Sequence, residues 1–504
     1  MNPITPSLQG DAPTVPLASL LCLVMGGFQL MGHGPEWLLW CSMITLSVVG
    51  FWGLARLLFM PQFVTAWSVY GVSVALAYGF GALNTFASGY MDGLSMLTVT
   101  YADHSALGRA QGAILLLVAA LLYIGHLDRN KLIPLQPFSD ADRKAALIVL
   151  AVVCAGTLLA LATGKLGFQG VQTGEDNTVL VSPLASLMVS ALTPVLALTA
   201  LAFGNQPPSR MRTIALVLGL VLAATLMTQG RRLFLFNTIA VLIALFATRN
   251  MRTLLTPRMA VLVLLVIVSA WGASRFFVSM RVAGYSLPPT ATIQERVTGA
   301  FDVLTNPQMY NLDEVIEENQ STRTFVVGYL AELIKASDAT QRTTEGDLLL
   351  LNVATSVPTA IWAGKWEVIS RVGSDENACH PKLGMPAWDA ANSIITEGLC
   401  DFRWPGMLIY PLAVVWLMTL ANLAVRRAPV VVRTLVCFAT VGSLLHVEGV
   451  LTGYLVGLRN IAMMAIVTWL LSYLFERYSQ LPSVVYARRE KAARKALRRE
   501  RGLS

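Results

Sequence analysis

Long apolar runs, separated by short polar connections, recur along most of the chain. A helix needs about 20 mostly apolar residues to cross the hydrocarbon core of a membrane. By that measure the pattern predicts an all-α polytopic membrane protein with about twelve membrane-spanning helices. The predicted spans are residues 14–32, 37–59, 63–86, 112–126, 146–163, 179–203, 213–228, 233–248, 259–276, 406–424, 431–447 and 451–474.

The composition narrows the class of protein further. Hydrophobic residues make up 55% of the 504 residues, and charged residues make up only 13%. Soluble globular proteins carry roughly 25% charged residues. These values exclude a disordered chain, a disulfide scaffold, a fibre and an ordinary cytosolic enzyme.

The charges divide the chain into parts of opposite sign. Residues 278–404 hold nine basic and sixteen acidic residues, whereas residues 477–504 hold nine basic and two acidic ones. The overall charge of +8 therefore indicates one basic side and one acidic lobe, and does not indicate nucleic-acid binding. The predicted divisions are nine membrane helices in 1–276, a large loop in 277–405, three membrane helices in 406–476 and a basic tail in 477–504.

Short connections that carry Lys and Arg tend to stay in the cytoplasm. With both termini inside, the cytoplasmic segments hold 22 basic residues and the short outer loops hold four. This bias predicts an inner-membrane protein with cytoplasmic termini and a periplasmic large loop. Helical patterns at 323–334, 348–362 and 387–399 indicate that the loop is folded.

Two of the six cysteines, Cys379 and Cys400, lie in the large loop, and the other four lie in apolar segments. Outside the cytosol the pair could form a disulfide, whereas in a reducing compartment both would remain thiols. The sequence leaves both alternatives open.

Arginines near the outer ends of spans suggest an anion site. Arg231 and Arg232 follow Gly230 between two predicted spans, against the inside-positive bias. Guanidinium groups bind phosphate oxygens in bidentate fashion, and Arg281 and Arg323 could converge on the same diphosphate. The alternative is that these side chains reach lipid headgroups or form surface ion pairs.

A polar run before the tenth span offers candidates for a general base. On a continuous helix, Asp389, Asn392, Ser393 and Glu397 would share one face. Asp389 or Glu397 could then take a proton from a sugar hydroxyl, or the run could be a capped helix with a polar face. His380 is a rival base, although a histidine in a Cys-His-Pro loop can equally be structural.

Three further polar residues, His446, Glu448 and Arg459, surround the junction of the last two spans. A charge within an apolar span is costly, so Arg459 is expected to pair with Glu448 or to line a wet cavity. The chain has no Walker, GxSxG, HExxH, CxxC or dinucleotide-binding motif. ATP-driven activity, a metal site and a cofactor are therefore not expected.

Two segments resemble bacterial O-antigen polymerases and ligases. The run Thr228-Gln-Gly-Arg-Arg-Leu-Phe-Leu-Phe-Asn237 is similar to a Gly-x-Arg segment that opens a span in that family. The run from Asn392 to Gly406 is similar to the Ser…Glu…Asn-Phe-Gly…Gly pattern of oligosaccharide repeat-unit polymerases. Here the Asn of the pattern is Asp401 and its first Gly is Arg403.

The resemblance implies a metal-independent, inverting membrane glycosyltransferase of the GT-C type. Its donor and acceptor would be undecaprenyl-diphosphate-linked glycans, elongated at the periplasmic face into O-antigen, capsule or exopolysaccharide. It implies that Arg231 or Arg232 holds the diphosphate, with membrane lipid, a chain-length regulator and export machinery as partners. An O-antigen ligase and a polysaccharide or lipid transporter are the alternative functions.

Overall fold

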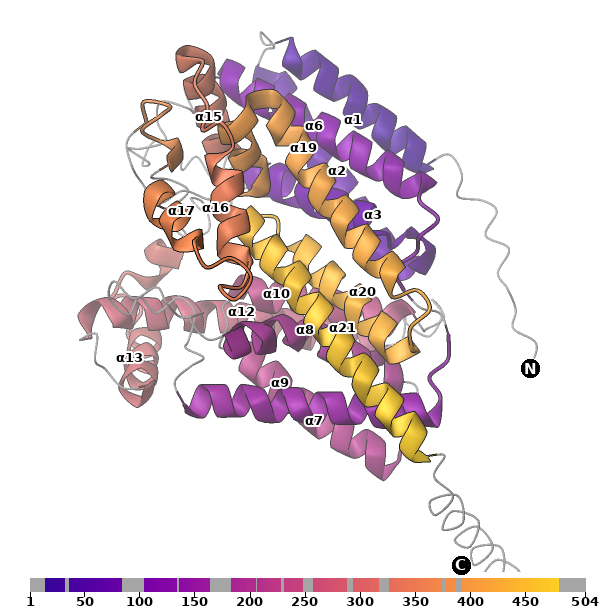
Figure 1. Ribbon diagram of the computed structural model, residues 1–504. Helices are drawn as coiled ribbons and strands as arrows, with labels where there is room; N and C mark the ends of the chain where they lie inside the picture. Colours follow the sequence, from indigo (N-terminus) through magenta and orange to yellow (C-terminus); the bar gives the residue numbers. More distant parts are fainter. Residues whose placement is uncertain are drawn as a thin grey trace, which may run out of the picture.

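The computed structural model describes residues 14–31, 36–83, 104–133, 136–163, 183–204, 206–227, 231–247, 257–287, 293–316, 326–373, 378–385 and 392–479. Every regular element within these ranges is a helix (Figure 1). The first half of the chain forms α1 (Thr14–Leu30), α2 (Glu36–Phe59), η1 (Pro61–Phe63), α3 (Ala66–Ala75), η2 (Leu76–Phe80), α6 (His104–Leu127), α7 (Asp140–Ala162), α8 (Pro183–Phe203), α9 (Arg210–Met227) and α10 (Arg231–Ala247). The second half forms α12 (Pro257–Ser286), α13 (Ile293–Thr305), α15 (Val326–Thr340), α16 (Asp347–Ser356), α17 (Lys365–Val372), α19 (Ile394–Ala424), α20 (Val430–Leu445) and α21 (Leu451–Ser479).

Each of the twelve predicted spans overlaps helical residues, and the third overlaps both α3 and η2. Among the described residues, seven helices are long and apolar enough to cross a membrane. The multi-pass all-α class is therefore supported, while the number twelve stays a prediction. Three of the other predicted spans, α1, α10 and α20, have only 16 or 17 residues. At 1.5 Å per residue such helices cover about 25 Å, less than the roughly 30 Å of a bilayer core.

Local side-chain chemistry sets where several helices begin. The side chains of Thr65, Ser139 and Ser393 each accept a hydrogen bond from the backbone N–H three residues ahead, and the backbone N–H of each donates in return to the side chain of that residue. These capping boxes satisfy backbone donors that the first turn of a helix leaves without partners. They start α3, α7 and α19.

The core of the bundle is built around α3, all ten residues of which are buried. Helices α2, α6, α19 and α20 pack against it, and α1 packs along α6. On the other side, α7 and α8 pack against α20 and α21, α10 packs against α8 and α20, and α9 packs against α7 and α8. Many of the outward-facing side chains of these helices are large and apolar, as expected for contact with lipid.

The segment between α12 and α19 forms the predicted lobe at one end of the bundle. In Figure 1, α13, α15, α16 and α17 lie on this side, while α1 begins and α21 ends on the opposite side. We call these the lobe side and the termini side. The patterns at 323–334 and 348–362 correspond to α15 and α16, whose bounds differ by several residues. The divisions predicted near 276 and 405 fall inside α12 and α19.

The lobe has two parts with different attachments. Helix α15 packs against α6 and α19, and nine of its residues are buried. Helices α12 and α13 instead pack on each other around a separate small core that contains Val278, Ala283, Val303 and Leu312.

Candidate functional site

A cavity of about 240 Å³ opens between four helices of the bundle. Its walls are the first half of α8, the second half of α20, the first half of α21 and Asn237 of α10. Helix α16 of the lobe packs against the start of α21, so the cavity lies on the lobe side. It has several times the room that one water molecule needs.

Small residues create much of this space. Gly442, Gly449, Gly453 and Gly457 all line the cavity. A Cβ added at Gly453 would meet no heavy atom within 4 Å, so this position borders open space. A Cβ at this position would therefore displace no wall atom.

Besides several hydroxyl groups, the cavity wall carries an imidazole and a carboxamide, those of His446 and Asn237. The His446 ring packs against Phe236 of α10, with centroids 5.6 Å apart. Asn237 is only 4% exposed, and its Nδ2 has no hydrogen-bond partner among the described residues. A buried donor without a partner is costly, so Asn237 is placed to donate to a bound molecule. Sequence reasoning missed this role, although Asn237 ends the run similar to the Gly-x-Arg segment.

The predicted diphosphate arginines Arg231 and Arg232 are the first two residues of α10, and their side chains lie outside the described part of the structure. Further along α10, Phe236 packs on His446 at the junction of α20 and α21. The next residue, Asn237, lines the cavity, so the first half of α10 borders it.

The other two predicted arginines are not brought to this cavity by the described structure. Arg281 is half-buried on α12 and is not among the residues that line the cavity. Arg323 lies outside the described residues. Arg275, near Arg281 on α12, forms an ion pair with Asp313 of the lobe.

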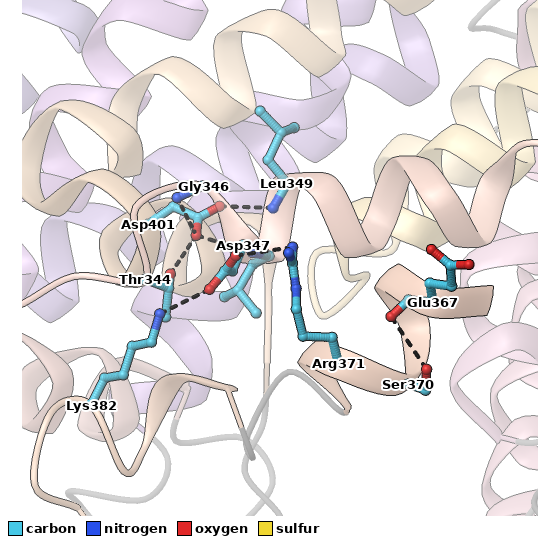
Figure 2. A network of polar contacts seen from close by, with 10 residues as sticks. Thr344, Gly346, Asp347, Leu349, Glu367, Ser370, Arg371, Lys382 and Asp401 are labelled. Carbon is cyan, nitrogen blue, oxygen red and sulfur yellow. Dashed lines mark hydrogen bonds and ion pairs between the residues drawn. The ribbon is translucent and has the colours of Figure 1, made fainter. Parts of the chain in front are cut away.

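A buried carboxylate, Asp401 of α19, holds the start of α16. Its oxygens accept hydrogen bonds from the backbone N–H groups of Gly346, Leu348 and Leu349, at 3.2, 3.2 and 2.8 Å. The Thr344 hydroxyl also donates to it (Figure 2), as does the Tyr410 hydroxyl at 2.5 Å. A negative charge at a helix N-terminus satisfies free N–H groups and is favoured by the helix dipole.

The end of α16 is held by a charge of the opposite sign. Arg459 of α21 donates from Nη1 to the carbonyl oxygen of Ser356, the last residue of α16, at 3.1 Å. A cation is favoured at a helix C-terminus. The hydrogen bonds of Arg459 in the described structure are with Ser356 and Asn460, and its pairing with Glu448 stays a prediction. Neither Arg459 nor Glu448 lines the cavity.

Glu397 has a similar capping role at α21. It is 2% exposed and accepts from the backbone N–H of Leu451, the first residue of α21, at 2.7 Å. It also accepts from Asn352 of α16 at 3.3 Å, and Asn352 in turn accepts from the Thr452 backbone N–H at 2.9 Å. Glu397 is therefore engaged in joining α16, α19 and α21 and does not face the cavity. We call Asn352, Glu397, Asp401 and Arg459 the α16 clamp.

The predicted common face of Asp389, Asn392, Ser393 and Glu397 is wrong in part. Ser393 has extended backbone angles and is the N-cap of α19, so the helix begins only at Ile394. A residue before the cap does not share the helical periodicity that follows it. Asp389 lies outside the described residues.

The rival base His380 is fully buried within the lobe. Its Nε2 lies 2.9 Å from the hydroxyl of Tyr329 on α15. Its neighbour Cys379 forms a disulfide with Cys400 of α19, with Cα atoms 5.9 Å apart. The structure thus contains one of the two states that the sequence left open, and His380 packs beside it, away from the cavity.

The turn after Cys400 has the backbone that the pattern's glycine would favour. Arg403, at the position of the first Gly, has φ 56° and ψ −143°. This region is rarely adopted by residues with a Cβ. The Arg403 side chain is held by Asp338 of α15, which also pairs with Arg109 of α6. Gly398 and Gly406 pack backbone to backbone across the turn.

No protein-family model, curated protein or solved structure matches this chain significantly. Within the described ranges, no group of three or more His, Cys, Asp or Glu residues is arranged to bind a metal. The structure supports a polytopic all-helical membrane protein with a polar cavity on the lobe side.

Proposed function

We propose that the protein polymerises undecaprenyl-diphosphate-linked oligosaccharide repeat units into a surface polysaccharide. The observation that carries the proposal is the lobe-side cavity, whose wall includes Asn237 of α10, the helix that begins with Arg231 and Arg232. Positive charge next to a polar cavity suits a lipid diphosphate, which becomes more negative as its sugar departs.

The chemistry needs few groups because the donor is already activated. The acceptor hydroxyl attacks the anomeric carbon as the bond from that carbon to the diphosphate oxygen breaks. The diphosphate leaves with the electron pair, and the hydroxyl proton passes to a base. His446 is the side chain in the cavity wall best suited to accept it, because imidazole is a common general base near neutral pH. Asn237 would donate a hydrogen bond to a sugar or phosphate oxygen.

Several features agree with a site at the periplasmic face of an inner membrane. The Cys379–Cys400 disulfide suits a lobe in an oxidising compartment. The backbone of Arg403 matches the glycine of the polymerase pattern. The twelve-span arrangement with both termini inside, and the partners that regulate chain length and export, belong to the same proposal.

The role of the arginine pair can be tested by replacing Arg231 and Arg232 with Ala and measuring glycan elongation in reconstituted vesicles. A matched control replaces Arg210 and Arg427, two exposed arginines on other connections. We expect elongation to be lost only in the first variant, with membrane insertion unchanged in both. Product lengths equal to wild type in the Arg231/Arg232 variant would contradict the proposal.

A second experiment separates the polymerase from its rivals. Deletion of the gene, followed by electrophoresis of the surface glycan, should remove long chains and retain single repeat units. Loss of every attached unit would instead favour a ligase or a flippase. Substrate accumulation in vesicles without elongation would favour a transporter.

A further inference from the structure

A second cavity, of about 230 Å³, lies on the opposite side of the molecule from the lobe. It lies between the connection from α6 to α7 and the connection from α19 to α20. The apolar and polar residues in its wall include Leu132, Thr419 and Asn422. Since these connections lie at the ends of spans, the cavity is positioned near the membrane surface.

Four cationic side chains line this cavity: Arg129, Lys131, Arg426 and Arg433. No carboxylate is among its lining residues, and none of the four forms an ion pair within the described part of the chain. Arg129, Lys131 and Arg426 are exposed and Arg433 is partly buried, so water weakens the repulsion among the four charges. All four charges would attract an anion bound in the cavity.

Hydrogen bonds fix the two connections around the cavity, and they use few of the N–H donors of the four cationic side chains. Arg433 uses Nη1 to donate to Gln136 at 3.0 Å, and Lys131 donates to the carbonyl oxygen of Asp128 at 2.7 Å. The α6–α7 connection is anchored by the Leu132 N–H, which donates to Val64 at 2.9 Å. At the end of α19, Asn422 donates to Thr440 of α20 at 2.7 Å.

The neighbouring Asp128 does not neutralise the cavity. Its Oδ1 accepts from the backbone and side chain of Asn130, both at 2.8 Å. Partial desolvation lowers the pKa of Lys131, and Asp128 opposes that effect. Asp128 thus supplies one negative charge near the four positive charges of the cavity, and its Oδ1 is bonded to Asn130.

We propose that this cavity binds a phosphate-bearing anion through Arg129, Lys131, Arg426 and Arg433. Guanidinium groups match phosphate oxygens in bidentate geometry, and several converging cations exceed what a chloride ion requires. The phosphate can belong to the headgroup of an acidic membrane lipid or to a soluble phosphate. Basic pockets at span ends have the chemistry that recognises such headgroups.

The test compares two double variants of the full chain in mild detergent. In the first, Arg129 and Arg426 are replaced with Gln, and neither guanidinium donates a hydrogen bond to a described group. In the control, Arg210 and Arg427 are replaced with Gln, which removes the same charge from exposed sites outside the cavity. Circular dichroism and elution volume report whether each variant is folded.

Two probes distinguish the sources of the phosphate. In the lipid arm, native mass spectrometry measures retention of phosphatidylglycerol against phosphatidylcholine. In the soluble arm, equilibrium dialysis measures binding of inorganic phosphate at constant ionic strength. Saturable binding in the lipid arm alone assigns a headgroup, and saturable binding in the soluble arm assigns free phosphate.

In either case we expect the Arg129/Arg426 variant to bind at least about tenfold more weakly, because charge-assisted hydrogen bonds are lost. The control should bind like the wild type. Absence of saturable binding in both arms would overturn the proposal, and so would equal weakening of both variants, which indicates general surface charge. The result is independent of glycan elongation.

Discussion

Arg403 offers a direct test of the turn that divides α19. Its φ of 56° lies where a Cβ is unfavourable, and its side chain pairs with Asp338 at 3.0 Å. We consider replacing it with Ala and, separately, with Gly. Both variants lose the ion pair, so that contribution cancels when the two are compared with each other. The comparison isolates the backbone.

The expected magnitude follows from two opposing effects. A residue with a Cβ in this region costs about 1–3 kcal/mol, and glycine avoids that cost. Glycine has more conformational freedom in the unfolded chain, which costs about 0.5–1 kcal/mol. Arg403→Gly should therefore be more stable than Arg403→Ala by roughly 1 kcal/mol. The lost ion pair, with both side chains about 30% exposed, accounts for no more than about 1 kcal/mol in either variant.

The assay is unfolding in mixed detergent with increasing dodecyl sulfate, followed by circular dichroism. Ala413→Gly, at an exposed position later in α19, provides the usual order, in which glycine is less stable than alanine by about 1 kcal/mol. The order should reverse at position 403. If Arg403→Ala is as stable as Arg403→Gly, the assigned backbone conformation is wrong.

Three further outcomes are expected. Asp401→Asn should lower the free energy of unfolding by at least about 3 kcal/mol, because several buried donors lose a charged acceptor. Dodecyl sulfate unfolding measures this change, and a decrease below about 1 kcal/mol would contradict the capping role. Gly453→Leu should block substrate binding without unfolding the protein, whereas Gly27→Leu, which also meets no atom within 4 Å, should leave elongation unchanged; equal elongation in both would argue against the cavity. Replacing Cys379 and Cys400 with Ser should lower stability by about 3 kcal/mol, since the bridge closes a loop across 21 positions; reductant should then affect only the wild type.

The helical segments could be predicted because a long apolar run in the sequence directly reflects the need of a membrane-spanning helix. A span must satisfy its backbone internally and present apolar side chains to lipid. The ends of the helices were harder to predict where the connection that follows a span is also helical. Helix α12, for example, continues ten residues beyond the predicted end at 276.

The site was harder to predict because its charged residues act on distant partners. Glu397 and Arg459 have the spacing and setting of functional charges, yet they satisfy the ends of α21 and α16. Arg459 and Ser356 are 103 residues apart, and no local pattern reveals that contact. Asn237 could have been found from its place one to two turns after the arginine pair on an otherwise apolar helix.

The separate core of α12 and α13 has a mechanical consequence. Val278 and Ala283 of α12 share this core with Val303 of α13, so a joint shift of the two helices would keep that apolar surface buried and would change mainly the contact of α12 with α10. The α16 clamp prevents a similar shift of α16. Moving α16 would separate Asp401 and Arg459 from the two helix ends that they cap. Under the proposed function, a long prenyl chain that enters from the side would therefore displace α12 and α13 together and leave α16 in place.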